Sequence, residues 1–357
     1  MAFTSSVPNL EINLKKFRHS LSDIQSKIGP NRRIMLSVKA NAYGHGAVPM
    51  AKAAVPQVAM FGIAHLEEAI ALRNANIQTP ILALSALPLD NFATARNISV
   101  IHTLYNLDYA RALDAFSVSH PTAVHIKVDT GMGRLGFLPD QLRRELPDLL
   151  DLKHLYIAGL YTHFSRADFP NDPYTLQQIE RFDALLADIR HQLPRDLIVH
   201  AANSGGIQNY PQAYYDMVRP GLMAYKGIQV LSARITEIRD LPAGYNVGYL
   251  TTYTTAGPSH VAVVHAGYAD GVPVSLSNKG QVVIRSRAYP IVGRVCMDML
   301  MVDLGENPDG ITTQDRAMLM DDRYPEISAQ AVAHASGRTL YETYCGISAR
   351  VRREYYS

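Results

Sequence analysis

The chain contains 357 residues, of which 47% are hydrophobic and 18% are charged, and its formal net charge is +2. This composition excludes a disordered chain, and a near-neutral charge without a basic run argues against nucleic acid or a membrane surface as a partner. Its two cysteines are too few for a disulfide framework or a zinc site, and no apolar stretch is long enough to span a bilayer. We therefore expect a soluble, cytoplasmic protein of two domains.

The first two thirds of the sequence alternate between short apolar runs and segments with helical spacing. After a predicted strand (7–14) and helix (14–28), β-prone runs occur at 33–40, 59–65, 80–86, 99–104, 123–129, 156–164, 197–203 and 216–222. Eight strands that alternate with helices are typical of a (β/α)8 barrel. An open doubly wound sheet is the competing architecture, but it does not need eight consecutive units. We therefore predict an α/β fold with a TIM-type barrel.

The sequence changes character after Gly221. β-prone runs broken by turns follow at 233–241, 247–255, 260–269, 280–292, 295–304 and 317–322, with one late helix at 328–337. This pattern predicts a second, mostly-β domain. The expected domains are a barrel over 10–226 and a β-rich domain over 227–357, to which residues 1–9 add a strand.

Polar and ionisable residues stand at the ends of the predicted barrel strands, where this fold builds its active sites. They are Lys39, His65, Ser85, Lys127, Asp129, His163, Asn203, Ser204 and Arg219. Ser204 begins a Gly-rich turn after strand seven and Arg219 closes strand eight, and the loops after these two strands commonly bind phosphate. A phosphorylated ligand that faces a single lysine on strand one indicates pyridoxal 5'-phosphate attached to Lys39.

Seven segments of the chain resemble alanine racemases. They are VKANAYGHG (38–46), HIKVDTGMGRLGF (125–137), GLYTHFSRAD (159–168), HAANSGG (200–206), RPGLMAY (219–225), GYADGVP (267–273) and PIVGRVCMDM (290–299). The resemblance covers nearly the whole chain and has the two-domain order of this pyridoxal-phosphate-dependent family, whose barrel is of fold type III. It implies racemisation of L- and D-alanine, which in this family supplies D-alanine for cell-wall peptidoglycan.

The resemblance also implies a mechanism with two bases. Lys39 would hold the cofactor and act on one face of the substrate, and Tyr268 of the partner subunit would act on the other face. The tyrosine would be linked through His163 or His200 towards Arg219, which would face the pyridine nitrogen without giving it a proton. Because the second domain reaches the neighbouring barrel in this family, the expected assembly is a homodimer with shared active sites.

Further positions match the cofactor and substrate contacts of the family. Besides Lys39, the cofactor contacts match Tyr43, His163, His200, Asn203, Ser204, Arg219, Gly221 and Leu222. Arg134 matches an arginine that contacts the substrate carboxylate and the phenolic oxygen of the cofactor, and Met297 matches a backbone contact to that carboxylate. Lys127 matches a lysine that is often carbamylated, and a carbamate would attract Arg134 where an ammonium would repel it.

The C-terminal segment GISARVRREYY departs from the family pattern. Ala349 stands where a tyrosine usually donates to the cofactor phosphate, and Arg352 stands where proline is usual. The smaller side chain leaves room for a substrate larger than alanine, so the resemblance also allows an alanine and serine racemase of relaxed specificity. The spacing of 224–230 departs as well, and we have no explanation for it.

Two other functions fit parts of the pattern. A non-catalytic barrel that carries the same cofactor would resemble the first 225 residues but would lack the β-rich domain and Tyr268. An amino-acid decarboxylase of fold type III would share both domains, but Arg219 in place of an acid and the GYADG segment (267–271) argue against it.

Overall fold

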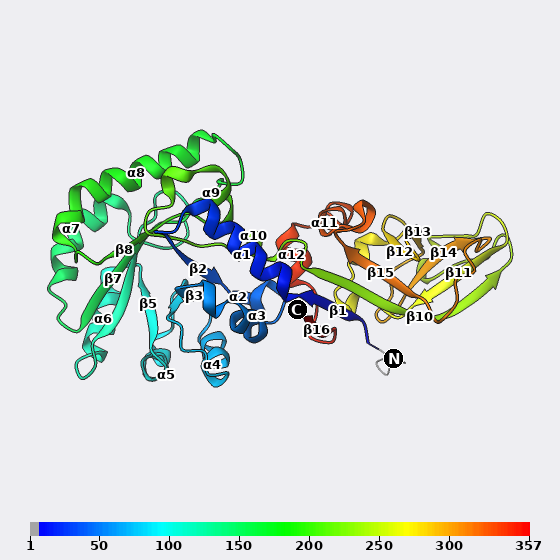
Figure 1. Ribbon diagram of the computed structural model, residues 1–357, viewed down its shortest axis with the longest axis horizontal. Helices are drawn as coiled ribbons and strands as arrows, with labels where there is room; N and C mark the ends of the chain where they lie inside the picture. Colours follow the sequence, from blue (N-terminus) through cyan, green and yellow to red (C-terminus); the bar gives the residue numbers. More distant parts are fainter. Residues whose placement is uncertain (1–6) are drawn as a thin grey trace. The chain divides into compact units, whose positions relative to one another are not determined.

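The computed structural model describes residues 7–357, which fall into two compact units (Figure 1). The barrel unit comprises 17–42 and 47–225, and the β-rich unit comprises the described residues up to Lys16 together with 43–46 and 226–357. The barrel predicted from the sequence, 10–226, also included 10–16, 43–46 and 226, which contact the β-rich unit more extensively. Of the predicted N-terminal strand segment 1–9, residues 1–6 lie outside the described part of the chain.

The barrel unit closes eight parallel strands in chain order (Figure 1). They are β2 (Arg33–Ser37), β3 (Met60–Ile63), β4 (Ile81–Ala83), β5 (Val100–Leu104), β6 (Thr122–Lys127), β7 (Leu155–Tyr161), β8 (Ile198–His200) and β9 (Met217–Val218). The ring closes where β9 pairs with β2, with Arg33 opposite Met217. The predicted (β/α)8 architecture is confirmed, and each strand overlaps one of the eight predicted runs. The first run is shorter than expected, because β2 ends at Ser37 and Lys39 follows the strand.

Helices surround these strands. They are α1 (Leu14–Ile28), α2 (Lys39–Tyr43), α3 (Ala47–Ala54), α4 (Leu66–Asn74), α5 (Phe92–Asn97), α6 (Leu107–Phe116), α7 (Pro139–Leu150), α8 (Pro173–Ile189), α9 (Ser204–Asn209) and α10 (Leu222–Tyr225). In α1, Phe17, Leu21, Ile24 and Ile28 are buried at the three- and four-residue spacing of one helical face. The predicted helix at 14–28 is therefore confirmed.

The inside of the barrel is filled by a small apolar cluster. Met35, Met60, Leu82, Tyr161 and Met217 come from five different strands, contact one another and are at most 5% exposed. Side chains from strands spread around a ring can meet only at its centre, so this cluster forms the packed interior of the barrel. It provides a rigid floor beneath the residues at the strand ends.

The β-rich unit is built around one long strand, β10 (Gln229–Leu241), which pairs with β1, β11 and β15. The other strands are β1 (Asn9–Asn13), β11 (Ser259–Val264), β12 (Gln281–Ile284), β13 (Arg287–Val292), β14 (Leu300–Gly305), β15 (Arg316–Asp321) and β16 (Arg352–Tyr356). The sheet order is β11-β14-β13-β12-β15-β10-β1-β16, and the additional β10–β11 pairing joins six of these strands into a ring. Register shifts where β10 pairs with β11 and with β15 increase the local bend, so that β10 pairs on both sides of that ring.

Two local predictions for the β-rich unit need correction. The run at 247–255 is not a strand but holds a short 3-10 helix (Tyr249–Thr251), and Gly248, Leu250 and Thr251 have positive φ angles that no strand can accommodate. The helix α11 (Ala329–Ser336) was predicted, but the next one, α12 (Leu340–Cys345), was missed. The sequence signal for α12 is the capping box formed by Thr339 and Glu342. The helix has only six residues, which is too short for a clear helical periodicity.

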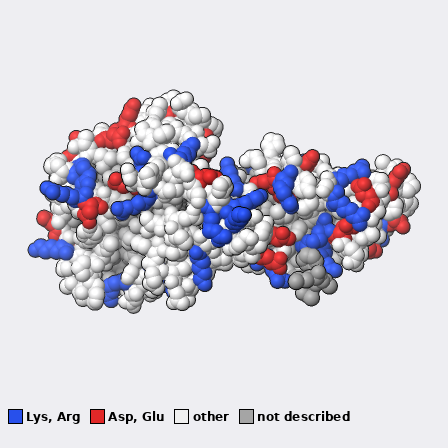
Figure 2. All heavy atoms as spheres, viewed as in Figure 1, with Lys and Arg blue, Asp and Glu red and all other residues white. Residues whose placement is uncertain are grey.

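Charged side chains of both signs are interspersed on the face shown in Figure 2. This agrees with the net charge of +2, and no strong long-range field of one sign is expected from that face. Among the described residues, none of the helices has both the length and the apolar character needed to cross a membrane.

Candidate active site

Lys39 is placed by a turn of left-handed backbone directly after β2. Ala40, Asn41, Ala42 and Tyr43 have φ angles between 52° and 55°, which non-glycine residues rarely adopt. Each such residue costs about 1–3 kcal/mol and persists only where its surroundings fix it. The turn therefore ends the extended backbone of β2 abruptly and fixes the backbone position of Lys39.

Glu68, on α4, is the main anchor of this turn. Its Oε1 accepts a hydrogen bond from the backbone N–H of Ala40 at 2.6 Å, and its Oε2 accepts from Ala64 N at 2.8 Å and His65 N at 3.2 Å. One carboxylate thus ties the turn after β2 to the end of β3. On the other side, Asn41 Oδ1 accepts from Ala47 N at 2.8 Å.

We expect Glu68→Gln to weaken this anchor, because an amide has only one acceptor oxygen and turns an N–H₂ group towards a backbone donor. The free energy of unfolding should fall by about 1–3 kcal/mol, the usual cost of an unsatisfied donor. Chemical denaturation measures it, and Glu67→Gln is the matched control, since Glu67 is exposed on the same helical turn. Equal stabilities of the two variants would contradict the assignment.

The loop after β6 is held by a single carboxylate. Asp129 Oδ1 accepts from the backbone N–H groups of Gly131, Met132 and Gly133, and its Oδ2 accepts from Arg134 N, at 2.8–3.1 Å. Burial alone would raise the pKa of Asp129, but these four hydrogen bonds outweigh it and hold the pKa below its usual value. The ionised carboxylate therefore fixes the loop that carries Arg134.

Four cationic groups gather at this end of the barrel, and we call Lys39, Lys127, Arg134 and Arg219 the cationic cluster. Lys127 is only 3% exposed. Burial, followed by the charges of Arg134 and Arg219, lowers its pKa to about 8, with Lys39 adding to the effect and Asp129 opposing it. The four cations outnumber the one ionised carboxylate of Asp129, so this end of the barrel carries an excess of positive charge that favours an anionic ligand.

Arg219, directly after β9, is 5% exposed and has neutral partners. Its Nη2 donates to the carbonyl oxygens of Thr162 at 2.7 Å and Ala201 at 2.9 Å, and lies 3.3 Å from His163 Nδ1. Its Nη1 donates to His200 Nδ1 at 2.8 Å. Burial lowers the pKa of Arg219 to about 10, so it stays charged at neutral pH.

Burial, and then the charges of the cationic cluster, hold the pKa of His163 well below its usual value, so this imidazole is neutral.

A second histidine extends this arrangement into the barrel. Since Arg219 can only donate, His200 Nδ1 must be the acceptor and its Nε2 must carry the proton, which is donated to His125 Nδ1 at 2.8 Å. His125 Nε2 then carries a proton as well and is buried without a hydrogen-bond partner. Burial lowers the pKa of His125 to about 3. Gly159 leaves the room for this ring, because a Cβ there would lie 2.5 Å from His125 Nδ1.

Tyr161 supports the same groups from below. Its ring stacks on that of His200 with centroids 4.7 Å apart and planes 7° apart, and the guanidinium of Arg219 lies 5.2 Å from its centroid. Lys127 Nζ lies 5.7 Å from that centroid. One aromatic ring thus contacts two members of the cationic cluster.

The turns after β8 and β9 are joined through Ser204. Its Oγ accepts from the backbone N–H groups of Gly221 at 3.1 Å and Met223 at 3.2 Å, next to Leu222 at the start of α10. Asn203 caps α9 by accepting from Gly206 N at 3.0 Å. The two segments predicted to hold a phosphate therefore lie side by side.

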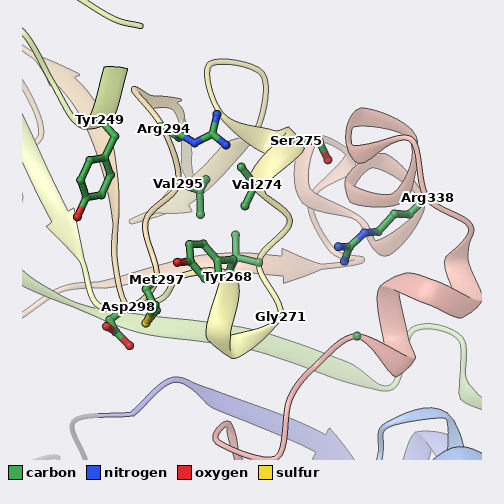
Figure 3. A pocket seen from close by; sticks show the side chains of 12 residues that line it. Tyr249, Tyr268, Gly271, Val274, Ser275, Arg294, Val295, Met297, Asp298 and Arg338 are labelled. Carbon is green, nitrogen blue, oxygen red and sulfur yellow. The ribbon is translucent and has the colours of Figure 1, made fainter. Parts of the chain in front are cut away.

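The remaining predicted site residues belong to the β-rich unit. Tyr268 stands on a short 3-10 helix (Tyr268–Asp270), and Tyr268 and Met297 are 45% and 52% exposed. They line one pocket of about 900 Å³ together with Tyr249, Arg294 and Asp298 (Figure 3). Tyr43 is nearly buried, its ring centroid 6.0 Å from that of Tyr341.

Three supporting residues of the barrel unit were missed by the sequence analysis as site residues. They are Glu68, His125 and Tyr161. Two of them carry a detectable signal, because His125 and Tyr161 each precede a predicted strand-end residue, Lys127 and His163, by two positions and so share its face of the strand. Glu68 has no such signal, since its partner Ala40 is 28 residues away.

A parallel barrel with a lysine after its first strand, followed in the chain by a β-rich unit, defines a class of two-domain barrel enzymes. The alanine racemase N-terminal domain model matches residues 12–229, and the C-terminal domain model matches 228–355. The chain belongs to the alanine racemase family, so the resemblance seen in the sequence is confirmed.

Individual relatives agree with this assignment. The alanine racemase of Desulforamulus reducens is 38% identical, with 97% of this chain and 98% of that protein covered, and that of Carboxydothermus hydrogenoformans is 36% identical with the same coverage. Among solved structures, the alanine racemase of Clostridium difficile 630 has a TM-score of 0.93 and 30% identity, covering 99% of this chain and 96% of that one. The predicted enzyme class, an isomerase acting on amino acids, is therefore confirmed.

Proposed function

We propose that this protein interconverts L- and D-alanine with pyridoxal 5'-phosphate, using Lys39 and the partner subunit's Tyr268 as its two bases. The observation that carries the proposal is the cationic cluster, in which Lys39, held by a strained turn at the end of a barrel strand, lies among three other cations. Chiral chromatography of L-alanine incubated with the cofactor-loaded protein tests it: a racemic product is expected, and recovery of unchanged L-alanine or of ethylamine would refute it.

The residues present fit the cofactor. The cationic cluster suits a ligand that bears a phosphate and a phenolate, and the turns at Ser204 and Gly221 bring the starts of α9 and α10 together beside it. Tyr43, Ser204, Gly221 and Leu222 would hold the phosphate, and Asn203 would support it. When bound, pyridoxal phosphate supplies the electron sink that makes the Cα proton of the amino acid removable.

The chain itself supplies the proton donors and acceptors. Lys39 Nζ would exchange a proton with one face of Cα, and Tyr268 Oη would exchange one with the opposite face. Arg134 would hold the substrate carboxylate, with the backbone of Met297 as a second contact. Arg219, kept charged and oriented by neutral partners, would face the pyridine nitrogen without donating its proton, and His163 and His200 would keep it in place.

Lys127 is the residue for which we propose carbamylation. Only the neutral amine reacts with CO₂, and a pKa of about 8 makes that form abundant in mildly alkaline solution. The resulting carbamate would give Arg134 and Arg219 an anionic neighbour in place of a repelling ammonium.

With ¹³C-labelled bicarbonate, we expect a carbamate resonance in the ¹³C NMR spectrum of the wild type that grows as the pH rises through about 8. Lys127→Gln should lack this resonance, and the exposed Lys153→Gln should retain it. The same spectrum from wild type and Lys127→Gln would show that the carbamate lies elsewhere.

A homodimer with shared sites is part of the proposal. Tyr268 and Met297 are accompanied by other exposed apolar side chains, Tyr249 at 66% and Leu250 at 75%. Several exposed apolar side chains next to polar residues of the same pocket are typical of a surface that another subunit covers. D-Alanine formed in this way would serve peptidoglycan synthesis in the cytoplasm.

Relaxed specificity towards serine is the second candidate function, and the position of Ala349 favours it. Its two neighbours both contact the turn of Tyr268, since Ser348 N donates to Asp270 O at 3.2 Å and Arg350 Nε lies 3.3 Å from Asp270 Oδ1. The small side chain thus stands close to the proposed base.

We expect Ala349→Tyr to lower the rate of serine racemisation relative to alanine, because the added ring would fill the space next to the proposed base. It should also slow cofactor loss on dialysis by about tenfold, the effect of one hydrogen bond to a charged group. An unchanged serine-to-alanine ratio would refute the steric role of this position.

A further inference from the structure

Two loops of the β-rich unit run side by side and carry Tyr268 and Met297 (Figure 3). Tyr268 N donates to Cys296 O at 2.9 Å, and Ala269 N donates to Met297 O at 3.0 Å. The approach is so close that a Cβ on Gly267 would lie 2.3 Å from Met297 O. The backbone position of Tyr268 is therefore set by the neighbouring loop.

The turn of Tyr268 is closed by a buried carboxylate. Asp270 is 2% exposed, and its Oδ2 accepts from Gly267 N at 2.9 Å. Its Oδ1 is buried without a hydrogen-bond partner. The neighbour of this oxygen is the guanidinium of Arg350, whose Nε lies 3.3 Å away in an ion pair without hydrogen-bond geometry. Burial of a carboxylate without such a counter-charge would be costly.

The same guanidinium reaches the second loop. Arg350 Nη2 donates to Asp298 Oδ1 at 2.8 Å, so one side chain bridges the turn of Tyr268 and the loop of Met297. The segment that carries Arg350 also packs against the turn through its backbone, because a Cβ on Gly271 would lie 2.3 Å from Gly346 O. A planar guanidinium can serve two carboxylates in different directions, whereas an ammonium acts as a single point charge.

We propose that Arg350 is a positioning residue that fixes the direction in which Tyr268 presents its phenol, by bridging Asp270 and Asp298. This inference rests on the proposed role of Tyr268 as one of the two bases. Arg350 acts through the turn, so its loss should displace one base and leave Lys39 in place.

The test compares Arg350→Ala and Arg350→Lys with Arg352→Ala in the cofactor-loaded protein. Arg352 is the matched control, because it is an exposed arginine two residues away that pairs with Glu354 on the same strand, at 3.0 Å. Exchange of the Cα proton with deuterium oxide is followed by NMR for L-alanine and D-alanine separately. The two bases serve opposite faces, so displacement of Tyr268 slows exchange of one enantiomer and spares the other.

Arg350→Ala should slow exchange of one enantiomer by about 10- to 100-fold, the cost of a misplaced catalytic group, and leave the other within a factor of about two. Arg350→Lys should show the same asymmetry between the enantiomers to a smaller degree. If Arg350→Ala does not fold, Arg350→Lys alone decides whether the asymmetry exists. Guanidinium chloride at low concentration should partly restore the slow exchange in Arg350→Ala but not in Arg350→Lys. Arg352→Ala should behave as the wild type.

The positioning role would be overturned if Arg350→Ala slowed exchange of both enantiomers equally. It would also be overturned if Arg350→Ala and the control Arg352→Ala exchanged both enantiomers at the same rates. These results differ from a failure of the proposed function, in which the wild type itself would not racemise alanine.

Discussion

Tyr268→Phe is expected to lower racemisation by about 10²- to 10⁴-fold, the usual contribution of a general acid–base group. The substitution removes one hydroxyl from a side chain that is 45% exposed, so the fold should be unaffected. Because Lys39 remains, exchange of the Cα proton with solvent deuterium should persist for one enantiomer and nearly cease for the other. Chiral analysis and NMR of the same samples measure both effects.

The control for this substitution is Tyr245→Phe, which removes a hydroxyl from another exposed tyrosine of the β-rich unit. Full racemisation by Tyr268→Phe would show that a different group serves the second face. Loss of exchange for both enantiomers would point instead to a role in binding.

Lys39→Ala is expected to have the largest effect of any single substitution. It removes both the covalent attachment of the cofactor and the base on one face, so racemisation should fall by about 10⁴-fold or more. The absorption band of the cofactor joined to lysine should also disappear from the purified protein. This second readout separates loss of attachment from loss of activity.

Lys52→Ala, an exposed lysine on α3, is the control for general effects of removing a charge. Retention of the lysine-linked cofactor band in Lys39→Ala would assign the attachment to another lysine, and Lys127 would be the first alternative to examine.

The barrel could be predicted because its strands are short, apolar and regularly spaced by helical segments, and such alternation has few other interpretations. The strand ends followed from the same pattern, which is why Lys39, Lys127, His163 and Arg219 could be named together. Their proposed roles came from the motifs and not from the spacing.

The supporting structure could not be predicted, because it depends on contacts between distant residues. The left-handed turn at Ala40–Tyr43 contains no glycine, and the carboxylate that anchors it comes from Glu68 on another helix. The hydrogen bond from His200 to His125 likewise joins two strands 75 residues apart. The wrong strand prediction at 247–255 has a local cause. The segment contains β-prone residues, but Gly248, Leu250 and Thr251 adopt positive φ angles that are incompatible with a strand.

Mixing the two inactive variants tests most directly whether each active site combines Lys39 of one subunit with Tyr268 of the other. Lys39→Ala and Tyr268→Phe are unfolded together and refolded, so that subunits pair at random. Half of the dimers should then be mixed, and each mixed dimer should hold one intact site, which restores about a quarter of the wild-type activity. Activity that stays at the level of the separate variants would contradict a site built from two subunits.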